Sequence, residues 1–428
     1  MELLALILFI SLFILILYGF PVAFTLGGLS VIYAFCFLDP QSFAALPSRI
    51  MGVMSNYVLL AVPLFVFMGI MLEKSGLAES MLETMASLFG RIRGGLAISV
   101  IVVGALLAAS TGIVGATVVT MGLISLPTML KRGYSPELAT GTIASSGTLG
   151  QIIPPSIVLV LLASVLNVPV GDLFKAAVVP GLLLVVAYIA YVSVKAIIHP
   201  HSAPTVKMEI PSGRALILAF ALPLLLIVSV LGSIFWGIAT PTEAAAISAL
   251  GATLLTILQK KFTKDALRVV MRETTHLTSM VFIILLGATT FSLVFRELRG
   301  DVYLTNLVLE SNLSPHGFLL LVMTLVFVSG FFIDFIEIIF IIVPVVAPIF
   351  HQMGVDLLWI GILMAVNLQT SFLTPPFGFS LFYLKGVAPA GVTTGHLYRG
   401  IVPFVLIQLV FLLLIAVFPQ IATFLLHR

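Results

Sequence analysis

The feature that most constrains the fold is a repeated proline pattern. Pro154-Pro155 and Pro375-Pro376 lie 221 positions apart, and each pair is inside a long apolar stretch. Other prolines repeat at nearly the same offset, Pro127 with Pro348 and Pro21 with Pro241. Because the offset is close to half of the 428 residues, we expect two copies of one structural unit.

The composition places those copies in a membrane. Hydrophobic residues make up 61% of the chain and charged residues only 9%, whereas about a quarter of a typical soluble domain is charged. Many apolar runs reach the roughly 20 residues that cross a bilayer as a helix. The sequence therefore predicts an all-α polytopic membrane protein. Its one cysteine, Cys36, excludes an internal disulfide and is expected to be buried.

The pattern of apolar segments predicts about eleven membrane spans and two re-entrant hairpins. The expected segments are 2–19, 21–38, 50–73, 95–109, 112–130, 137–166, 173–198, 215–236, 241–258, 276–295, 317–328, 331–350, 357–384 and 400–425. Within 95–130 and 317–350 the two segments meet with no charged loop, which favours hairpins that enter and leave on one side. The segments 137–166 and 357–384 contain the double prolines and are expected to be broken helices.

The distribution of basic residues predicts the orientation. With the N-terminus outside and both hairpins re-entrant, 15 of the 20 Lys and Arg residues lie on the inner side, as the positive-inside rule requires. The predicted units are residues 1–198, a cytoplasmic linker at 199–214, and residues 215–428. The second unit starts on the opposite side from the first, so the repeats are inverted and both termini are expected in the periplasm.

Small polar residues gather at the two hairpin tips and the two helix breaks. The first candidate site consists of Ser110, Thr111, Gly112, Gly115, Ser145, Ser146, Gly147, Thr148, Gln151, Pro154 and Pro155. The second consists of Ser329, Gly330, Asp334, Asn367, Gln369, Thr370, Ser371, Thr374, Pro375 and Pro376. Unwound carbonyls and hydroxyls can coordinate Na⁺, and half-helix N-termini suit an anionic substrate. Close helix packing also explains single Ser or Gly residues, but not the constellation repeated at a matched offset.

Three carboxylates lie within or beside apolar segments. Asp334 is expected to act at the second site because an ionisable group at membrane depth is costly. Glu337, three residues later, is a candidate for substrate selectivity or a structural pairing. Glu243 follows Thr240 at capping-box spacing, so a structural cap is expected there. No metal-ligand spacing of histidines, nucleotide-binding loop or catalytic triad is present, and no cofactor other than the coupling Na⁺ is expected.

These motifs resemble a known family, the large membrane subunits of tripartite ATP-independent periplasmic (TRAP) transporters. The resemblance is carried by 237–244, 145–155, 332–334 and 370–378, and it extends over essentially the whole chain. It implies an elevator-type Na⁺-coupled importer in the bacterial or archaeal inner membrane. It also implies a small membrane subunit and a periplasmic substrate-binding protein as partners, and organic acids as substrates.

The chain departs from many family members at Glu337, where they carry proline. The stretch 334–338 is similar to the subgroup termed mannitol/chloroaromatic-type, which argues against sialic acid or a simple C4-dicarboxylate as the substrate. The main alternative is a stand-alone Na⁺- or H⁺-coupled carboxylate or anion carrier of the same architecture, without partner subunits. An enzyme would require a polar catalytic cluster at one face, and a channel would not require two opposed hairpins.

Overall fold

The computed structural model describes residues 2–206, 213–311 and 313–426, and for residues 40, 110, 111, 214 and 215 it describes the backbone alone. Every regular element in these ranges is a helix. Helices satisfy their backbone hydrogen bonds internally, as a hydrocarbon environment requires. The predicted all-α polytopic class is confirmed.

The helices fall into two successive sets. The first set is α1 Glu2–Leu17, α2 Val22–Phe37, α3 Leu46–Met54, α4 Ala61–Lys74, α5 Leu77–Phe89, α6 Gly95–Thr111, α7 Val114–Lys131, α8 Pro136–Thr148, α9 Ile157–Leu166 and α10 Val170–Ile198. The second set is α11 Gly213–Leu216, α12 Leu222–Phe235, α13 Pro241–Leu258, α14 Lys264–Glu297, α15 Gly300–Glu310, α16 Pro315–Ser329, α17 Phe335–Ile341, α18 Val343–Gln352, α19 Leu357–Leu373, α20 Phe379–Val387, α21 Thr394–Val417 and α22 Gln420–Thr423.

Side-chain caps fix several helix starts. Ser135, Thr240 and Ser314 each accept a hydrogen bond from the first turn, and each is followed by proline at the first helical position. The predicted capping box at α13 is confirmed. The Thr240 amide donates to Glu243 Oε2 at 2.8 Å, and the Glu243 amide donates to Thr240 Oγ1 at 3.3 Å.

In the described ranges, seven helices are long and apolar enough to cross a membrane alone, or eight if α17 and α18, which meet at 50°, count as one span. This is fewer than the eleven expected spans. The difference arises in part because α1, α2 and α19, which belong to expected spans, are only 16 to 17 residues long. In addition, the segment 137–166 divides into the short helices α8 and α9.

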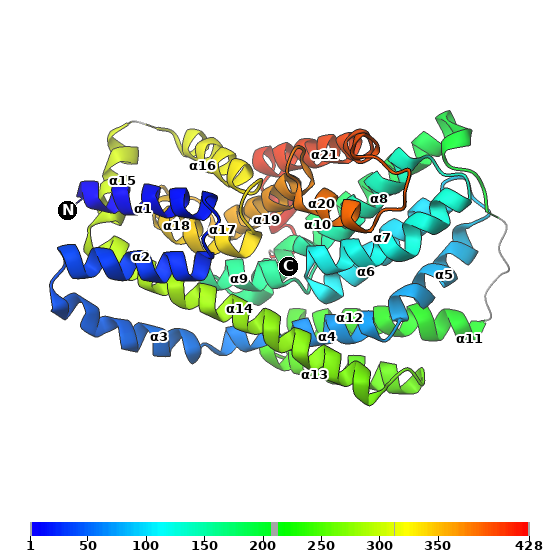
Figure 1. The fold of residues 1–428 in the computed structure, drawn as a ribbon, viewed down its shortest axis with the longest axis horizontal. Helices are drawn as coiled ribbons and strands as arrows, with labels where there is room; N and C mark the ends of the chain where they lie inside the picture. Colours follow the sequence, from blue (N-terminus) through cyan, green and yellow to red (C-terminus); the bar gives the residue numbers. More distant parts are fainter. Residues whose placement is uncertain (1, 207–212, 312, 427–428) are drawn as a thin grey trace.

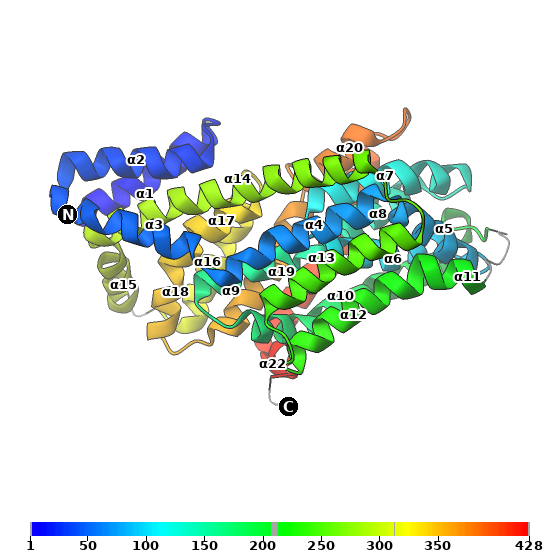
Figure 2. The same ribbon diagram turned by 90° about the horizontal axis from the view of Figure 1, so that it is seen from below.

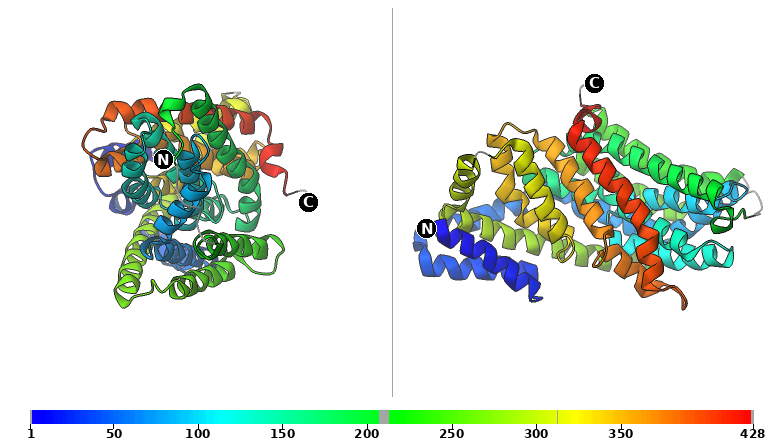
Figure 3. Two further views of the ribbon diagram at one scale, coloured as in Figure 1. Left: turned by 90° about the vertical axis from the view of Figure 1, so that its right-hand side faces the viewer. Right: turned by 90° about the horizontal axis from the view of Figure 1, so that it is seen from above.

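The helices form two groups. Helices α2, α4, α12, α13 and α14 make up the first bundle, in which α14 packs against α2 and α4, and α13 packs against α4 and α12. Helices α6 to α10 and α16 to α21 make up the second bundle, in which α8 contacts α6, α7, α19 and α21. Figure 1 shows α12, α13 and α14 below the second bundle, Figure 2 shows the first bundle extended side by side, and Figure 3 (left) shows it end-on as a lower lobe.

Equivalent elements of the two halves occupy related positions. The pair α8–α9 is interrupted at Pro154-Pro155, and the pair α19–α20 is interrupted at Pro375-Pro376. The pair α6–α7 corresponds to α16 followed by α17 and α18. Gln369 Nε2 donates to Thr148 Oγ1 at 3.5 Å, across a separation of 221 residues. Two residues at the repeat offset touch each other only near an axis that relates the repeats, so α8 and α19 meet at that axis. The boundaries of the predicted units remain a prediction.

Some local expectations differ from the structure. Helix α14 begins at Lys264, twelve residues before the expected apolar segment, because its first turns are helical although charged. Helices α5 and α15 were not expected as apolar segments, and Figure 1 shows α15 lying across the direction of its neighbours. Cys36 is exposed rather than buried, because it lies on a face of α2 that no other described helix covers.

Candidate functional site

The tip of the first hairpin is a two-residue break between α6 and α7. Helix α6 ends at Thr111 and is capped by Gly112, whose φ of 62° lies in the left-handed region that glycine adopts without strain. Ile113 then precedes α7 in an extended conformation. The backbones of Ser110 and Thr111 form the last turn of α6, while their side chains lie outside the described residues. Gly115 packs against the ring of Tyr383 from α20, which joins this hairpin to the opposite half.

Helix α8 carries the first site toward the hairpin. From Leu138 to Thr148 every residue of α8 is buried, although many are polar. The hydroxyl groups of Ser145, Ser146 and Thr148 donate to carbonyls three residues earlier, at 2.9 to 3.1 Å. Their protons are therefore used within the helix. Thr148 Oγ1 also accepts from Gln369 Nε2, and the remaining lone pairs of these oxygens can accept from a donor or coordinate a cation.

Gln151 is the unusual residue of this break. Its side chain is fully buried, and neither Oε1 nor Nε2 has a hydrogen-bond partner among the described residues. A buried amide without partners costs about 1–3 kcal/mol per group and calls for an explanation such as a bound ion, a ligand or a water molecule. The Gln151 carbonyl accepts from Ser156 Oγ at 3.0 Å. This bond closes the turn that contains Pro154-Pro155 and leads into α9.

The second hairpin and the second broken helix are in direct contact. Gly330 follows α16, and a methyl group at this position would collide with Ser371 of α19. Glycine is therefore required by the close approach. The rings of Phe318 and Phe350 lie 4.7 Å apart and hold α16 against α18. Ser329 is buried at the end of α16.

Helix α19 repeats the pattern of buried polar groups without partners. Asn367 Nδ2 donates to the Met323 carbonyl at 2.7 Å, but Asn367 Oδ1 and Gln369 Oε1 have no partner in the described ranges. The hydroxyls of Thr370, Ser371 and Thr374 donate to backbone carbonyls of the same helix at 2.7 to 2.8 Å. The free oxygens of α19 thus match those of α8. Pro375 and Pro376 are less buried than Pro154 and Pro155.

The two hairpin carboxylates form a helix cap. Asp334 is the N-cap residue of α17 and Glu337 its third residue, and together they make a capping box. The Asp334 amide donates to Glu337 Oε2 at 3.3 Å. Asp334 Oδ1 remains buried without a partner among the described residues. The spacing that predicted the cap at Glu243 also fits Asp334 and Glu337, but a capping box was not predicted there.

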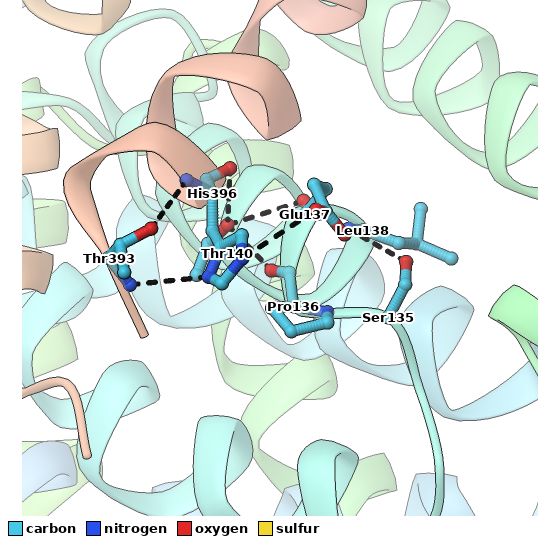
Figure 4. A network of polar contacts seen from close by, with 7 residues as sticks. All are labelled: Ser135, Pro136, Glu137, Leu138, Thr140, Thr393 and His396. Atoms are coloured by element: carbon cyan, nitrogen blue, oxygen red, sulfur yellow. Dashed lines mark hydrogen bonds and ion pairs between the residues drawn. The ribbon is translucent and has the colours of Figure 1, made fainter. Parts of the chain in front are cut away.

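A polar network anchors the start of α8 to the start of α21 (Figure 4). Thr140 Oγ1 donates to the Pro136 carbonyl at 2.7 Å and lies 3.4 Å from the His396 carbonyl. The Thr393 amide donates to His396 Nδ1 at 3.2 Å, and His396 Nε2 lies 3.9 Å from Glu137 Oε1. These contacts fix the position of α8 at the end remote from its break.

A large cavity opens in front of the first hairpin. This hairpin-1 cavity has a volume of about 1040 Å³ and lies between α4, the start of α7 and the N-terminal half of α14. Ile113 and Ala116 line it from the hairpin, and Ile70 and Glu73 line it from α4. Residues 269–279 of α14 supply most of the remaining lining.

A smaller cavity lies beside the second hairpin. This hairpin-2 cavity has a volume of about 240 Å³ and is lined by α3, the middle of α14, and Phe340 and Pro344 of the second hairpin. Both cavities therefore lie between α14 and a hairpin. The cavity beside the first hairpin is therefore the larger of the two.

Sequence reasoning missed the residues of α4 and α14 that line the hairpin-1 cavity. Neither Arg272 nor His276 was among the predicted site residues. Thr120 of α7 donates to Glu73 Oε1 at 2.9 Å, a bond between the hairpin and the first bundle that had not been expected. The spacing of Arg272, His276 and Ser279 along one helical face was a signal that could have identified this wall.

Paired broken helices and paired hairpins around buried, unpartnered oxygens define the architecture of a secondary transporter. The chain matches the family described as "Tripartite ATP-independent periplasmic transporter, DctM component" over residues 9–421. It belongs to this family, and it is a multi-pass transporter subunit rather than an enzyme.

Individual relatives agree with this assignment. The chain is 34% identical to the C4-dicarboxylate TRAP transporter large permease protein DctM of Pseudomonas aeruginosa, over 92% of each chain. It is 31% identical to the sialic acid TRAP transporter large permease protein SiaM of Vibrio cholerae, over 94% of this chain and 93% of the relative. The crystal structure of the Alcanivorax borkumensis YdaH transporter covers 97% of this chain and 98% of its own, with a TM-score of 0.64 and 15% identity, which shows a shared fold.

Proposed function

We propose that this chain is the transporting subunit of a Na⁺-coupled importer of organic acids that receives its substrate from a periplasmic binding protein. The observation that carries the proposal is the set of buried oxygens without partners at two matched helix breaks. Gln151 Oε1 marks the first break, and Asn367 Oδ1 and Gln369 Oε1 mark the second. Oxygen ligands from amides, hydroxyls and unwound carbonyls are the donors that a hard cation such as Na⁺ requires.

The residues present fit a cation at each site. At the first site, Na⁺ would be held by the Gln151 amide oxygen, the hydroxyl oxygens of α8 and the carbonyls of the hairpin tip. At the second site, Asp334 adds a full negative charge to the corresponding set. Bound Na⁺ would give these oxygens the partner they lack, neutralise the Asp334 carboxylate at the second site, and join each hairpin to its broken helix. A substrate carboxylate would then be attracted to the cations and to the half-helix N-termini.

We expect the second bundle to carry the substrate in an elevator movement along the first. Two features support this mechanism. Both hairpins and both broken helices belong to the second bundle, and the hairpin-1 and hairpin-2 cavities lie between it and α14. In the predicted topology the first hairpin enters from the cytoplasm, so the described conformation would be open inward. Closing the larger cavity and opening the smaller one would give the outward-open state.

The proposal includes an inner-membrane location, periplasmic termini and two partners, a small membrane subunit and a soluble binding protein. The relatives named as large permease proteins support a smaller companion subunit. Copurification of the tagged chain with a small helical membrane protein is expected. Efficient transport by the chain alone, without any companion, would favour the stand-alone carrier instead.

The central experiment measures uptake by proteoliposomes that contain the chain and its companion subunit, with the binding protein outside. An inward Na⁺ gradient should drive accumulation of an organic acid, and replacing Na⁺ with K⁺ should abolish it. Accumulation driven by a proton gradient and indifferent to Na⁺ would overturn the Na⁺ assignment.

A further inference from the structure

The wall of the hairpin-1 cavity that α14 provides is polar in a regular pattern. Arg272, Thr275, His276 and Ser279 all line the cavity, and all four are exposed. Their spacing of three, one and three residues places them on one face of the helix. From Arg272 to Ser279 this row extends about 10 Å along the helix axis, at about 1.5 Å per residue. Since polar side chains facing lipid are costly, the row is suited to a water-filled cavity.

The acidic groups of the cavity are already paired. Glu73 accepts a hydrogen bond from Thr120 at 2.9 Å, and its Oε1 also lies 3.7 Å from Lys74 Nζ. The same Lys74 Nζ lies 3.2 Å from Glu273 Oε1. The side chains of Arg272 and His276, in contrast, make no ion pair or hydrogen bond within the described ranges. The groups of this cavity left available to a ligand are therefore donors rather than acids.

We propose that Arg272 and His276 form a binding station for small organic carboxylates between the first hairpin and the mouth of the cavity. The inference rests on the proposed function, because it assumes that the cavity is the release path of the substrate. The planar guanidinium group offers paired N–H donors that match a carboxylate. His276, one turn further along α14, can donate to a second acceptor. Across the cavity, Ile70, Ile113 and Ala116 supply an apolar wall for the carbon skeleton.

The Arg272–His276 station mainly changes how fast a carboxylate reaches the cavity, and changes the equilibrium affinity for the carboxylate less. Charges at the rim of a site mainly change the rate at which a charged ligand arrives and the dependence of that rate on salt. Arg272 would therefore concentrate anions in the cavity and guide their exchange between the hairpin and the cytoplasm. The competing explanation is that Arg272 only orients the protein in the membrane, like the neighbouring basic residues of α14.

The test uses charged thiol reagents and needs no transport. A cysteine is placed at Ser279, the residue of the row farthest from the start of α14, in the full chain with its native cysteine replaced. Its labelling rates are measured with a negatively charged and with a positively charged methanethiosulfonate reagent of similar size. We expect Arg272→Gln to lower the ratio of anionic to cationic labelling about three- to tenfold, as one charge acting over about 10 Å allows.

Two variants serve as controls. Arg272→Lys keeps the positive charge and should keep the ratio, which shows that a loss in Arg272→Gln does not reflect misfolding. Arg268→Gln removes an exposed arginine of the same helix that does not line the cavity, and it should leave the ratio unchanged. An unchanged ratio in Arg272→Gln, or an equal fall in Arg268→Gln, would overturn the inference.

Ligand protection completes the test. Succinate serves as a generic carboxylate probe rather than as the transported substrate; it should slow anionic labelling of the cysteine at position 279, and uncharged succinamide should not. Arg272→Gln should weaken the succinate protection by a similar factor, and equal protection in this variant would overturn the carboxylate assignment. Because labelling does not require Na⁺-driven uptake, a failure of this inference is distinguishable from a failure of the proposed function, which the uptake assay measures separately.

Discussion

Replacing Asp334 with asparagine separates the two roles that the structure combines at this residue. As the N-cap of α17, Asp334 can be replaced by asparagine at little cost, because Asn and Asp are about equally good caps. The Glu337 side chain still accepts from the amide of residue 334, since that bond uses the backbone. The substitution therefore keeps the shape of the hairpin and removes the charge.

The expected loss is in Na⁺ binding. Asp334 Oδ1 is buried without a partner in the described ranges, so in the proposed site it is available to the cation. Hydrogen bonds to charged groups contribute about 1.5–3 kcal/mol, and a carboxylate–Na⁺ contact of the same magnitude corresponds to Na⁺ affinity about 10- to 150-fold weaker in Asp334→Asn. The assay is the Na⁺ concentration that gives half-maximal uptake in proteoliposomes, with thermal unfolding measured in parallel.

Glu243→Gln is the matched control, since it alters a capping box of the same type outside either site. It should lower thermal stability and leave the Na⁺ dependence unchanged. Glu337→Gln should shift substrate preference rather than coupling. A wild-type Na⁺ dependence in Asp334→Asn, in protein that is folded and assembled with its companion subunit, would refute the assignment of the charge to the second site.

Three further predictions concern the first break, the second hairpin and the topology. Gln151→Leu should leave thermal stability unchanged or raise it, because it removes a buried amide without partners, and Na⁺-dependent uptake should fall at least tenfold. A large loss of stability in this variant would show that the amide has a structural role instead. Gly330→Ala should destabilise the protein by about 1–3 kcal/mol, as overpacking does, and the double variant with Ser371→Gly should recover most of the unfolding temperature. In a cysteine-free background, cysteines at Ser42 and Ser202 should react with a membrane-impermeant reagent from opposite sides, and labelling of both from one side would contradict the inverted topology.

The all-α membrane class of the fold was predictable because spanning a bilayer requires long apolar segments, which are visible in the sequence. Long apolar runs have one stable solution in hydrocarbon, the helix, and the double prolines locate the breaks within two of those runs. Thr240 and Glu243 are a cap that sequence spacing alone identifies. The span count was less predictable, because hydropathy does not show that α1 and α2 stop at 16 residues each.

The wall of the hairpin-1 cavity was not predictable from local pattern. Glu73 and Thr120 are 47 residues apart, and nothing near either one indicates their contact. Arg272 looked like one more basic residue at a membrane boundary, since its relation to the cavity depends on how α14 packs against α4. Helices α5 and α15 were missed for a related reason. They are short, and their apolar residues do not form a continuous run.

The two halves differ in charge at the start of the second helix of each hairpin. At the offset of 221 residues, Asp334 corresponds to Ile113, and Glu337 corresponds to Ala116. The first hairpin therefore begins its second helix without a carboxylate, and the second hairpin begins it with two. If both breaks bind Na⁺, the first site must rely on neutral oxygens such as Gln151 Oε1, whereas the second has a formal charge. Neutral ligands attract a cation less strongly than a carboxylate does, so we expect the second site to fill at lower Na⁺ concentration, and Asp334→Asn to make the two sites more alike.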